Sequence, residues 1–237
     1  MFGGLLVAPA ECRRYNTHEM KLDGTGILIN LAPLGERDAL ATIFTREYGV
    51  MRGVMRAAQI ARKNKPLVGQ VGGMSWNARL DSQLGAFHWE AARNLSAPLM
   101  LNARSLSLMN AAFALVGALL PERVAFGGLY DATLDVLTGL ARGGDVDAVY
   151  LDWEIALLRD AGYALDLSRC SGCGCVTELN YLSPRTGRAV CETCAAPYIS
   201  KLYRLPLTLE TTLKFIGGAC AQQGADVPPA RIFVLRK

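Results

Sequence analysis

The sequence has no apolar run long enough for an ordinary membrane-spanning helix. Its longest stretch without a charged residue covers 105–121, which is only 17 residues, and it includes Ser105, Ser107, Asn110 and Pro121. A transmembrane helix needs about 20 predominantly apolar residues. We therefore interpret this stretch as a buried helix of a globular protein and expect no contact with a membrane.

A secretory leader and a nucleotide-binding loop are also missing. Residues 1–11 are apolar, but they have no basic segment before them and no small-residue cleavage site after them. The sequence contains no glycine–lysine loop of the Walker type, which argues against an ATP-driven motor. Patterned sequence begins only at Met20, so residues 1–19 are expected to be a disordered arm or an extension from a misassigned start codon.

Cysteine is not scarce, but its distribution argues against a disulfide framework. Five of the seven cysteines fall within 25 residues, between Cys170 and Cys194. Clustering of this kind is typical of metal binding in a reducing compartment. We therefore expect a cytoplasmic protein.

The net charge of +4 is too small to identify a partner, but it is unevenly distributed. Segment 46–79 has seven lysines and arginines against one acid, a balance of +6, whereas 105–168 has three arginines against nine acids, a balance of −6. Positive charge concentrated in so short a segment favours contact with a polyanion.

Short apolar runs separated by glycines predict a small all-β unit between Gly24 and Ala91. In one run Met74, Trp76 and Ala78 alternate with polar side chains, which is the period of a half-buried strand. Five short strands within about 70 residues indicate a barrel of the OB type. The candidate strands are Gly26–Leu31, Ala39–Thr45, Val50–Ala57, Gly72–Leu80 and Leu84–Glu90.

After Pro98 the hydrophobic spacing becomes helical, and four apolar stripes predict four helices of a bundle core. The first stripe stops at Pro121 and the second at Gly143-Gly144. The third is expected to begin after Asp145 or Asp147 and to end at Gly162, and Thr208 is the expected N-cap of the fourth. The stripes cover 106–120, 130–141, 149–157 and 209–220.

Two Cys-x2-Cys pairs separate the third and fourth predicted helices. Cys170 with Cys173 and Cys191 with Cys194 are separated by 17 residues, a spacing that predicts a four-thiolate zinc site. Because four protein ligands leave no open position, we predict one structural Zn²⁺ ion and no zinc chemistry. Between the pairs, residues 180–183 and 188–190 are expected to form a hairpin around a turn at 184–187.

Cys175 remains outside this pattern. The Cys173-x-Cys175 spacing makes a poorer metal-binding knuckle than Cys-x2-Cys, so Cys175 is assigned as a spare thiol. Whether Cys175 replaces Cys173 as a metal ligand stays open.

The cations of segment 46–79 are the candidate nucleic-acid ligands, because lysine and arginine attract phosphates irrespective of base sequence. The aromatic residues of the same region, Tyr48, Trp76, Phe87 and Trp89, could stack on bases, although buried aromatics are commoner. The candidate phosphate ligands are Arg46, Arg52, Arg56, Arg62, Lys63, Lys65 and Arg79.

Two other functional classes fit parts of the sequence. His88-Trp-Glu90 has the H-x-E form of a zinc deaminase, but no proline precedes either cysteine pair, and the gap to them is about 80 residues, far longer than that signature allows. The alternative that stays open is a zinc-ribbon interaction module that binds RNA or acts in transcription or translation. Neither alternative changes the predicted zinc ligands.

Several motifs resemble the RecO recombination-mediator family of bacterial DNA repair proteins. In the barrel region they are Gly24-Thr-Gly-Ile-Leu-Ile29, Leu34-Gly-Glu-Arg-Asp-Ala39 and Phe44-Thr-Arg-Glu-Tyr-Gly49. The more specific motifs are Asp160-Ala-Gly-Tyr163, the stretch from Tyr181 to Val190, and the two cysteine pairs in that order. The resemblance runs from about Met20 to about Pro229.

The resemblance implies an α+β multidomain protein with an N-terminal OB-fold β-barrel, an α-helical domain and a four-cysteine zinc-ribbon-like insert. The expected boundaries are 1–19 for the extension, 20–98 for the OB-fold, 99–166 with 200–237 for the helical domain, and 167–199 for the insert. The resemblance also implies that Arg37 is a nucleic-acid ligand, because Arg37 lies in the region of the chain that corresponds to the family's DNA-binding segment. The end, Arg231–Lys237, departs from the amphipathic helical tail expected of the family.

The implied function is not enzymatic. The family binds single- and double-stranded DNA and anneals complementary strands. It acts with RecR and binds the acidic C-terminal tail of single-strand-binding protein, and so helps to load the RecA recombinase. A protein of this kind is expected at the nucleoid.

Overall fold

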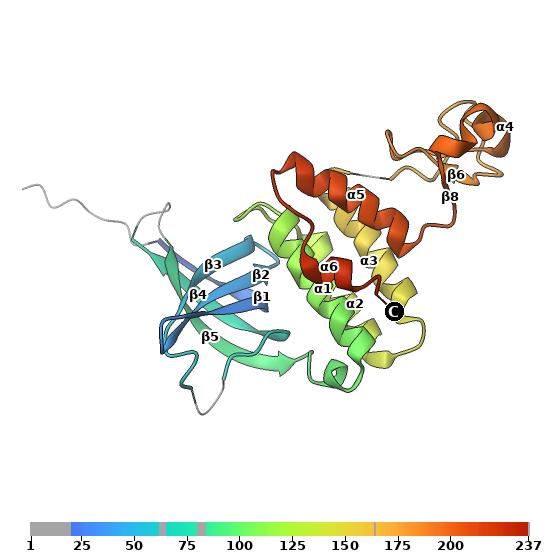
Figure 1. Cartoon of the computed structure of the whole chain (residues 1–237). Helices are drawn as coiled ribbons and strands as arrows, with labels where there is room; N and C mark the ends of the chain where they lie inside the picture. The colour runs from blue at the N-terminus through green and yellow to red at the C-terminus, as the bar shows by residue number, and fades with distance from the viewer. Residues whose placement is uncertain (1–19, 62–64, 80–83, 164, 237) are drawn as a thin grey trace, which may run out of the picture.

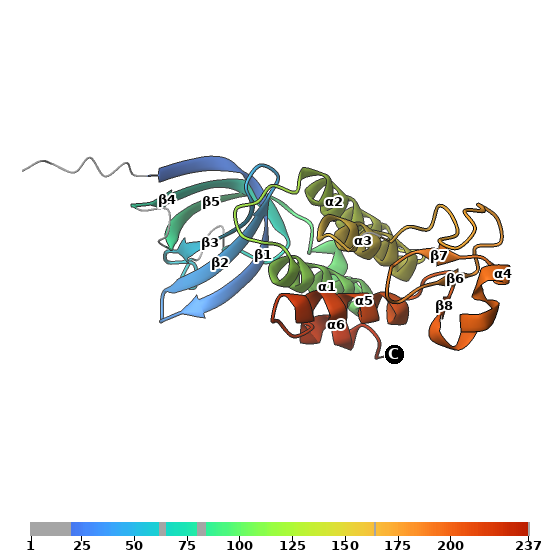
Figure 2. The ribbon, with the colours of Figure 1, turned by 90° about the horizontal axis from the view of Figure 1, so that it is seen from above.

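The computed structural model of the chain describes residues 20–61, 65–79, 84–163 and 165–236. Three parts follow one another along its length (Figure 1): a β-unit, a bundle of helices, and a small cysteine-rich insert at the far end of the bundle. The view from above shows the same order, with the helices between the strands and the insert (Figure 2). The predicted extension at 1–19 lies outside the described residues.

Five strands form the β-unit and close on one another in the order β1-β2-β3-β5-β4. Neighbours are antiparallel except β3 and β5, which are parallel. The strands are β1 (Met20–Leu34), β2 (Asp38–Thr45), β3 (Gly49–Met55), β4 (Gln70–Ala78) and β5 (Gly85–Asn94). This is the OB-like unit that the sequence predicts.

Strand β1 is longer than predicted because it pairs with two different neighbours. Its first half, Met20–Ile27, pairs with β4, and its second half, Gly26–Leu34, pairs with β2, with a register irregularity between Leu28 and Asn30. The first half is half exposed and has few apolar residues, so the alternation used for prediction is weak there.

The interior of the barrel contains the predicted apolar face of β4. Met74, Trp76 and Ala78 are buried, and the indole Nε1–H of Trp76 donates to the carbonyl of Arg52 at 3.0 Å. Leu80, the last residue of the predicted strand, lies outside the described residues. The hydrogen bond satisfies the one polar atom of a large buried ring.

The four predicted helices are α1 (Ala103–Leu119), α2 (Gly127–Arg142), α3 (Val146–Asp160) and α5 (Leu209–Gln222). Asp145, not Asp147, caps α3, and its carboxylate accepts from the N–H of Ala148 at 3.0 Å. Thr208 caps α5 as predicted. The shorter helical segments are η1 (Pro98–Leu101), α4 (Glu192–Ala195), η2 (Ala196–Lys201) and α6 (Pro229–Phe233). No helix within the described ranges has both the length and the apolar character needed to cross a membrane.

One continuous apolar core joins the barrel to the helices. The outer sides of β1 and β2 pack on the bundle, and the rings of Phe44 and Tyr130 meet edge to face with centroids 5.6 Å apart. The α1–α2 connection runs along β3, where the N–H of Arg123 donates to the carbonyl of Val50 at 3.0 Å. This junction determines which surfaces of the barrel can reach a ligand.

Gly49 at the start of β3 is required by this junction. Its φ is 65°, and a Cβ added there would lie 1.8 Å from the carbonyl oxygen of Val124. We expect Gly49→Ala to destabilise the protein by more than the roughly 1–2 kcal/mol that the left-handed conformation alone costs. The measurement is thermal unfolding, in which 1 kcal/mol corresponds to about 2–4 °C for a protein of this size. Gly73→Ala is the control because its Cβ would meet no atom within 4 Å. Equal melting temperatures for the two variants would contradict the tight junction.

The insert contains the predicted hairpin and one strand that the sequence did not predict. Strands β6 (Tyr181–Leu182) and β7 (Ala189–Val190) pair antiparallel, and β8 (Tyr203–Arg204) adds to the other side of β6. A two-residue strand has no readable hydrophobic period, so β8 could not be found from the sequence.

The chain end is held by a short helix and a buried ion pair. Arg231–Lys237 shows no amphipathic helical pattern, but the five-residue helix α6 overlaps its first three residues and packs against α1. Arg231 is fully buried and pairs with the equally buried Glu154 of α3. The packing of α6 depends on a buried charged side chain. Hydrophobic periodicity cannot predict such packing because it considers only apolar residues.

Candidate metal centre and nucleic-acid interface

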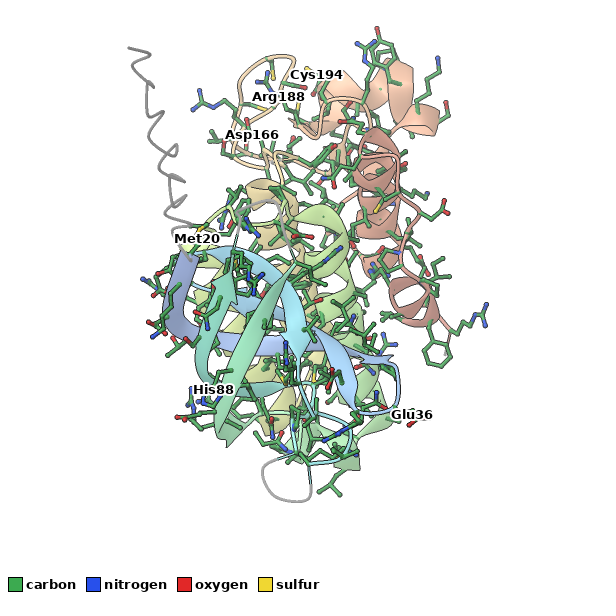
Figure 3. All side chains as sticks on the ribbon, turned by 90° about the vertical axis from the view of Figure 1, so that its left-hand side faces the viewer. Met20, Glu36, His88, Asp166, Arg188 and Cys194 are labelled. Carbon is green, nitrogen blue, oxygen red and sulfur yellow. The ribbon has the colours of Figure 1, made fainter. Side chains whose placement is uncertain are left out.

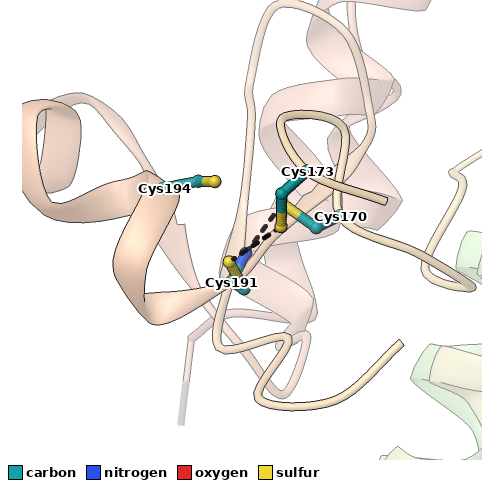
Figure 4. A group of neighbouring side chains, drawn as sticks. All are labelled: Cys170, Cys173, Cys191 and Cys194. Carbon is teal, nitrogen blue, oxygen red and sulfur yellow. Dashed lines mark hydrogen bonds between the residues drawn. The ribbon is translucent and has the colours of Figure 1, made fainter. Parts of the chain in front are cut away.

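The four predicted cysteine ligands come together in the insert. The sulfur atoms of Cys170, Cys173, Cys191 and Cys194 all lie within 4.8 Å of one another. They point into one space from the two knuckles, with Cys194 on the side opposite Cys173 (Figure 4). Cys173 and Cys191, 18 positions apart in sequence, meet because the β6–β7 hairpin turns the chain back between the knuckles.

Backbone N–H groups prepare the sulfur of Cys170 to carry negative charge. The N–H groups of Cys191 and Gly172 donate to this sulfur at 3.4 and 3.3 Å. Together with the N–H of Cys173, they lower the pKa of the Cys170 thiol to about 5. Because metals bind the thiolate form, these hydrogen bonds favour coordination.

The spacing of the sulfurs fits a tetrahedral metal ion. With metal–sulfur bonds of about 2.3 Å, the edges of a Zn–S tetrahedron are about 3.8 Å long. The sulfurs of Cys173 and Cys191 are 3.7 Å apart. Hydrogen bonding to the sulfur of Cys173 raises the pKa of Cys194 to about 12. Four sulfur atoms gathered in this way suit a thiophilic cation.

Cys175 lies beside the four-sulfur group but outside it. Its thiol donates to the carbonyl of Thr177 at 3.5 Å, and hydrogen bonding to the sulfur of Cys173 raises its pKa to about 12. The thiol of Cys175 is not among the four sulfur atoms that all lie within 4.8 Å of one another. The geometry supports the assignment of Cys175 as a spare thiol.

Two predicted nucleic-acid ligands, Arg46 and Arg52, contact the helical domain. Arg46 makes two hydrogen bonds to the carboxylate of Asp131 in α2, at 3.0 and 2.7 Å, and lowers its pKa. Arg52 pairs with Glu122 at 3.1 Å and donates to the carbonyl of Gly117 at 3.4 Å. Both arginines face acids of the bundle, so we assign them to the junction.

The other described candidates are free of such partners. Arg37, Arg56, Lys65 and Arg79 are exposed, and none forms an ion pair with another described residue. The carbonyl of Arg37 accepts from the N–H of Gln59 at 3.1 Å, so Arg37 lies beside the turn that follows Arg56. Arg62 and Lys63 lie outside the described residues.

Arg56 borders a groove of about 410 Å³ on the barrel. The groove opens where the β3–β5 pairing ends at Met55 and Phe87 while β5 continues. Its other walls include His88 and Trp89 of β5, and Figure 3 shows His88 on this part of the barrel. A cation beside a partly exposed indole is a combination suited to a phosphate and a base.

The candidate stacking aromatics differ in how exposed their rings are. Trp76 and Phe87 are only 0% and 6% exposed, so neither can serve as an open platform for a base. Trp89 and Tyr48 are partly exposed. Trp89 therefore remains the candidate on the groove.

The deaminase hypothesis does not fit the geometry. His88 pairs with Glu90 at 3.2 Å on the exposed face of β5. The cysteines are in the insert, well separated from His88 in Figure 3. These residues therefore cannot share one metal ion.

Comparison with known proteins covers both halves of the chain. Residues 20–92 match the family described as recombination protein O N terminal, and residues 100–224 match the one described as recombination protein O C terminal. The first match covers most of the barrel. The second covers the helices and the cysteine insert up to α5.

Similar curated proteins carry one name, DNA repair protein RecO. The protein of Dinoroseobacter shibae is 39% identical over 183 residues, which are 76% of this chain and 76% of the relative. That of a Jannaschia species is 38% identical over 188 residues, 78% of this chain and 76% of the relative. That of Roseobacter denitrificans is 36% identical over 211 residues, 88% of this chain and 83% of the relative.

Proposed function

The chain belongs to the RecO family of DNA repair proteins, and on this premise we propose that it binds single- and double-stranded DNA and anneals complementary strands without catalysing a reaction. The observation that carries the proposal is the barrel groove, where the exposed Arg56 stands beside Trp89. Phosphate attraction from the cation and stacking on the ring together suit single strands of any sequence.

The proposal extends to the family's recombination work. The protein would act with RecR and bind the acidic tail of single-strand-binding protein. In this way it would help to load RecA, in the cytoplasm, onto DNA that is covered by single-strand-binding protein. These partners come from the family resemblance alone. The proposal does not assign them to a surface of this chain.

The proposed ion of the insert is one structural Zn²⁺ held by Cys170, Cys173, Cys191 and Cys194. Four thiolates suit zinc, and they fill its tetrahedral coordination. When bound, the ion supplies a cross-link between the two knuckles. The chain's own part is to present four sulfurs at this spacing and to donate N–H groups to Cys170.

Strand annealing by the purified full-length protein, without nucleotide, tests the function. Annealing of complementary DNA oligonucleotides above the spontaneous rate is the expected result. No acceleration together with no DNA binding would refute the proposal, and binding confined to RNA would support the RNA-module alternative instead.

Charge reversal at the groove tests the site. We expect Arg56→Glu with Lys65→Glu to reduce the salt slope of single-strand binding by about 1.4, since each neutralised phosphate contributes about 0.7. If the affinity in 1 M salt is unchanged, this corresponds to roughly 25-fold weaker binding in about 0.1 M salt. Fluorescence anisotropy with a labelled oligonucleotide measures both quantities.

The matched control is Arg142→Glu with Arg236→Glu, which changes the net charge equally on the helical domain. Both arginines are exposed. Arg52 is left intact because its pairing with Glu122 serves the junction. Equal losses in the two double variants would show a general charge effect and remove the groove as a specific site.

A further inference from the structure

A second groove, of about 830 Å³, lies on the insert. Its walls come from three segments: the first cysteine knuckle, the β6–β7 hairpin with its turn, and η2. No aspartate or glutamate lines it. The lining includes Arg185, Arg188 and Lys201 together with several hydroxyl groups, so its polar side chains are mostly donors.

The wall that carries the two arginines is held by a tight turn. The N–H of Gly187 donates to the carbonyl of Ser183 at 2.9 Å, and the N–H of Ser183 donates to the carbonyl of Arg188 at 2.9 Å. The N–H of Ser171 donates to the carbonyl of Ala189 at 2.9 Å, which ties the hairpin to the first knuckle. The cations therefore project from a fixed frame.

The three cations are available to a ligand. Arg185, Arg188 and Lys201 are exposed, and none forms an ion pair with another residue that the structure describes. Asp166 forms a backbone bridge with Arg188, and hydrogen bonds from Ser168, with a smaller contribution from Arg188, lower the pKa of its carboxyl. Residues 167–204 contain five lysines and arginines against two acids.

An aromatic ring stands beside these charges. Tyr198 is 58% exposed on η2, and it precedes Lys201 by three residues. Side chains three apart in a 3₁₀-helix lie on the same side. The phenol ring and the ammonium group therefore face the groove together, and both line it.

We propose that this groove is a second site for single-stranded nucleic acid, with phosphates on Arg185, Arg188 and Lys201 and a base stacked on Tyr198. The inference rests on the proposed function and adds a contact surface to it. The insert that carries the groove is at the opposite end of the helical bundle from the barrel (Figures 1 and 2), and Figure 3 shows Arg188 and Cys194 together on the insert. A strand bound at both sites runs along the bundle.

Charge balance offers the competing explanation. Four thiolates with one Zn²⁺ carry a net charge of −2, and the groove adjoins Cys194. Cations placed only to offset that charge would have no ligand, and their removal would weaken metal retention. An acidic peptide is the other polyanion that could occupy the groove, but it would make no use of an open ring beside phosphate-sized donors.

Photocrosslinking of the zinc-loaded full-length protein is the direct test. A single-stranded oligonucleotide that carries 5-iodouracil is expected to crosslink at Tyr198, identified by mass spectrometry of the digested protein. Crosslinks confined to the barrel, with Trp89 labelled and Tyr198 unlabelled, would overturn the inference and leave the proposed function standing.

The triple variant Arg185→Gln, Arg188→Gln, Lys201→Gln supplies the energetic test. With an oligonucleotide several times longer than the roughly 4–16 nucleotides of one barrel site, we expect the salt slope to fall by about 2 and the affinity in about 0.1 M salt to fall about 100-fold. Tyr198→Leu is expected to weaken binding at least about fivefold without changing the slope. Zinc content measured in parallel must stay at the wild-type level.

The outcomes separate the explanations. Unchanged affinity of the triple variant for the long strand would overturn the inference, as would a loss of zinc that accounts for the whole effect. Loss of binding to an acidic peptide with DNA binding intact would also overturn it. A weakened insert variant beside an unaffected Arg56→Glu, Lys65→Glu variant would support the insert groove and refute the barrel site of the proposed function.

Discussion

Replacing Cys170 by serine is expected to release the metal and unfold the insert while the barrel and the bundle keep their structure. The apparent binding free energy of a structural zinc site is roughly 10–16 kcal/mol, and it acts as folding free energy for the segment that holds the ion. The apolar core of the insert is small and includes Cys170 and Cys191 themselves. Without the ion, little remains to hold the two knuckles together.

Three measurements check this expectation. Zinc per chain should fall from one to near zero by elemental analysis, and limited proteolysis should cut between residues 167 and 204. Circular dichroism should retain the helical signal, because α1, α2, α3 and α5 pack in a separate core. DNA binding should weaken only through the insert groove, since the barrel groove lies outside the insert.

Cys175→Ser is the matched control for the same chemical change in the same loop. Because Cys175 stands outside the four-sulfur group, this variant should retain one zinc ion and resist proteolysis. If Cys175→Ser lost the ion while Cys173→Ser kept it, the ligand set would have to be revised in favour of Cys175.

Breaking the buried pair of Arg231 and Glu154 is expected to destabilise the helical domain by about 3–5 kcal/mol, because the remaining charge would be buried without its partner. Both side chains are 0% exposed. Glu154 accepts hydrogen bonds from Arg231, Thr212 and Tyr150. Arg231 also donates to the carbonyl of Leu209 at 2.6 Å.

This network joins α3, α5 and α6, so its loss affects the docking of the chain end. Burial is the main cause of the strongly raised pKa of Tyr150, and the nearby Glu154 carboxylate adds to it. One nitrogen of Arg231, Nη1, has no hydrogen-bond partner among the described residues. A buried charge with an incompletely satisfied guanidinium is a costly arrangement, so we expect the pair to specify how α6 docks more than to add stability.

Urea unfolding followed by tryptophan fluorescence measures the effect, since Trp153 precedes Glu154 in α3. Arg231→Met and Glu154→Leu should each cost several kcal/mol, whereas the double replacement should recover much of the loss. Arg159→Gln, which breaks an exposed pair with Asp160 in the same helix, should cost no more than about 1 kcal/mol. A single-variant cost at Arg231 as small as that of Arg159→Gln would contradict the role given to the buried pair.

Much of the fold could be predicted because the relevant signals are local. The alternation of Met74, Trp76 and Ala78 indicates a strand, and Pro121 and Thr208 mark a helix end and a helix start. These features depend on residues a few positions apart, which is the range over which backbone geometry acts. The Cys-x2-Cys spacing is local in the same sense, so the metal ligands could be named from it.

The assignment of the basic residues could not be completed in this way. Local sequence patterns do not show that the basic segment 46–79 contacts the acidic segment 105–168. In the structure Arg46 pairs with Asp131 and Arg52 pairs with Glu122, where the barrel and the bundle join. Part of the positive charge is therefore balanced inside the molecule. Only the exposed arginines and lysines that remain can serve a polyanion.

The sequence by itself determined the positions along the chain of the five barrel strands and the four long helices, the Thr208 cap, and the four cysteines that could hold a metal ion. The tertiary structure decided which cations stay exposed, which aromatic rings are open, and where Arg231 is buried. The physical reason is that charge balance and burial depend on partners far apart in sequence, such as Glu154 and Arg231, which are 77 positions apart. Those partners meet only when the barrel, the bundle and the insert have packed.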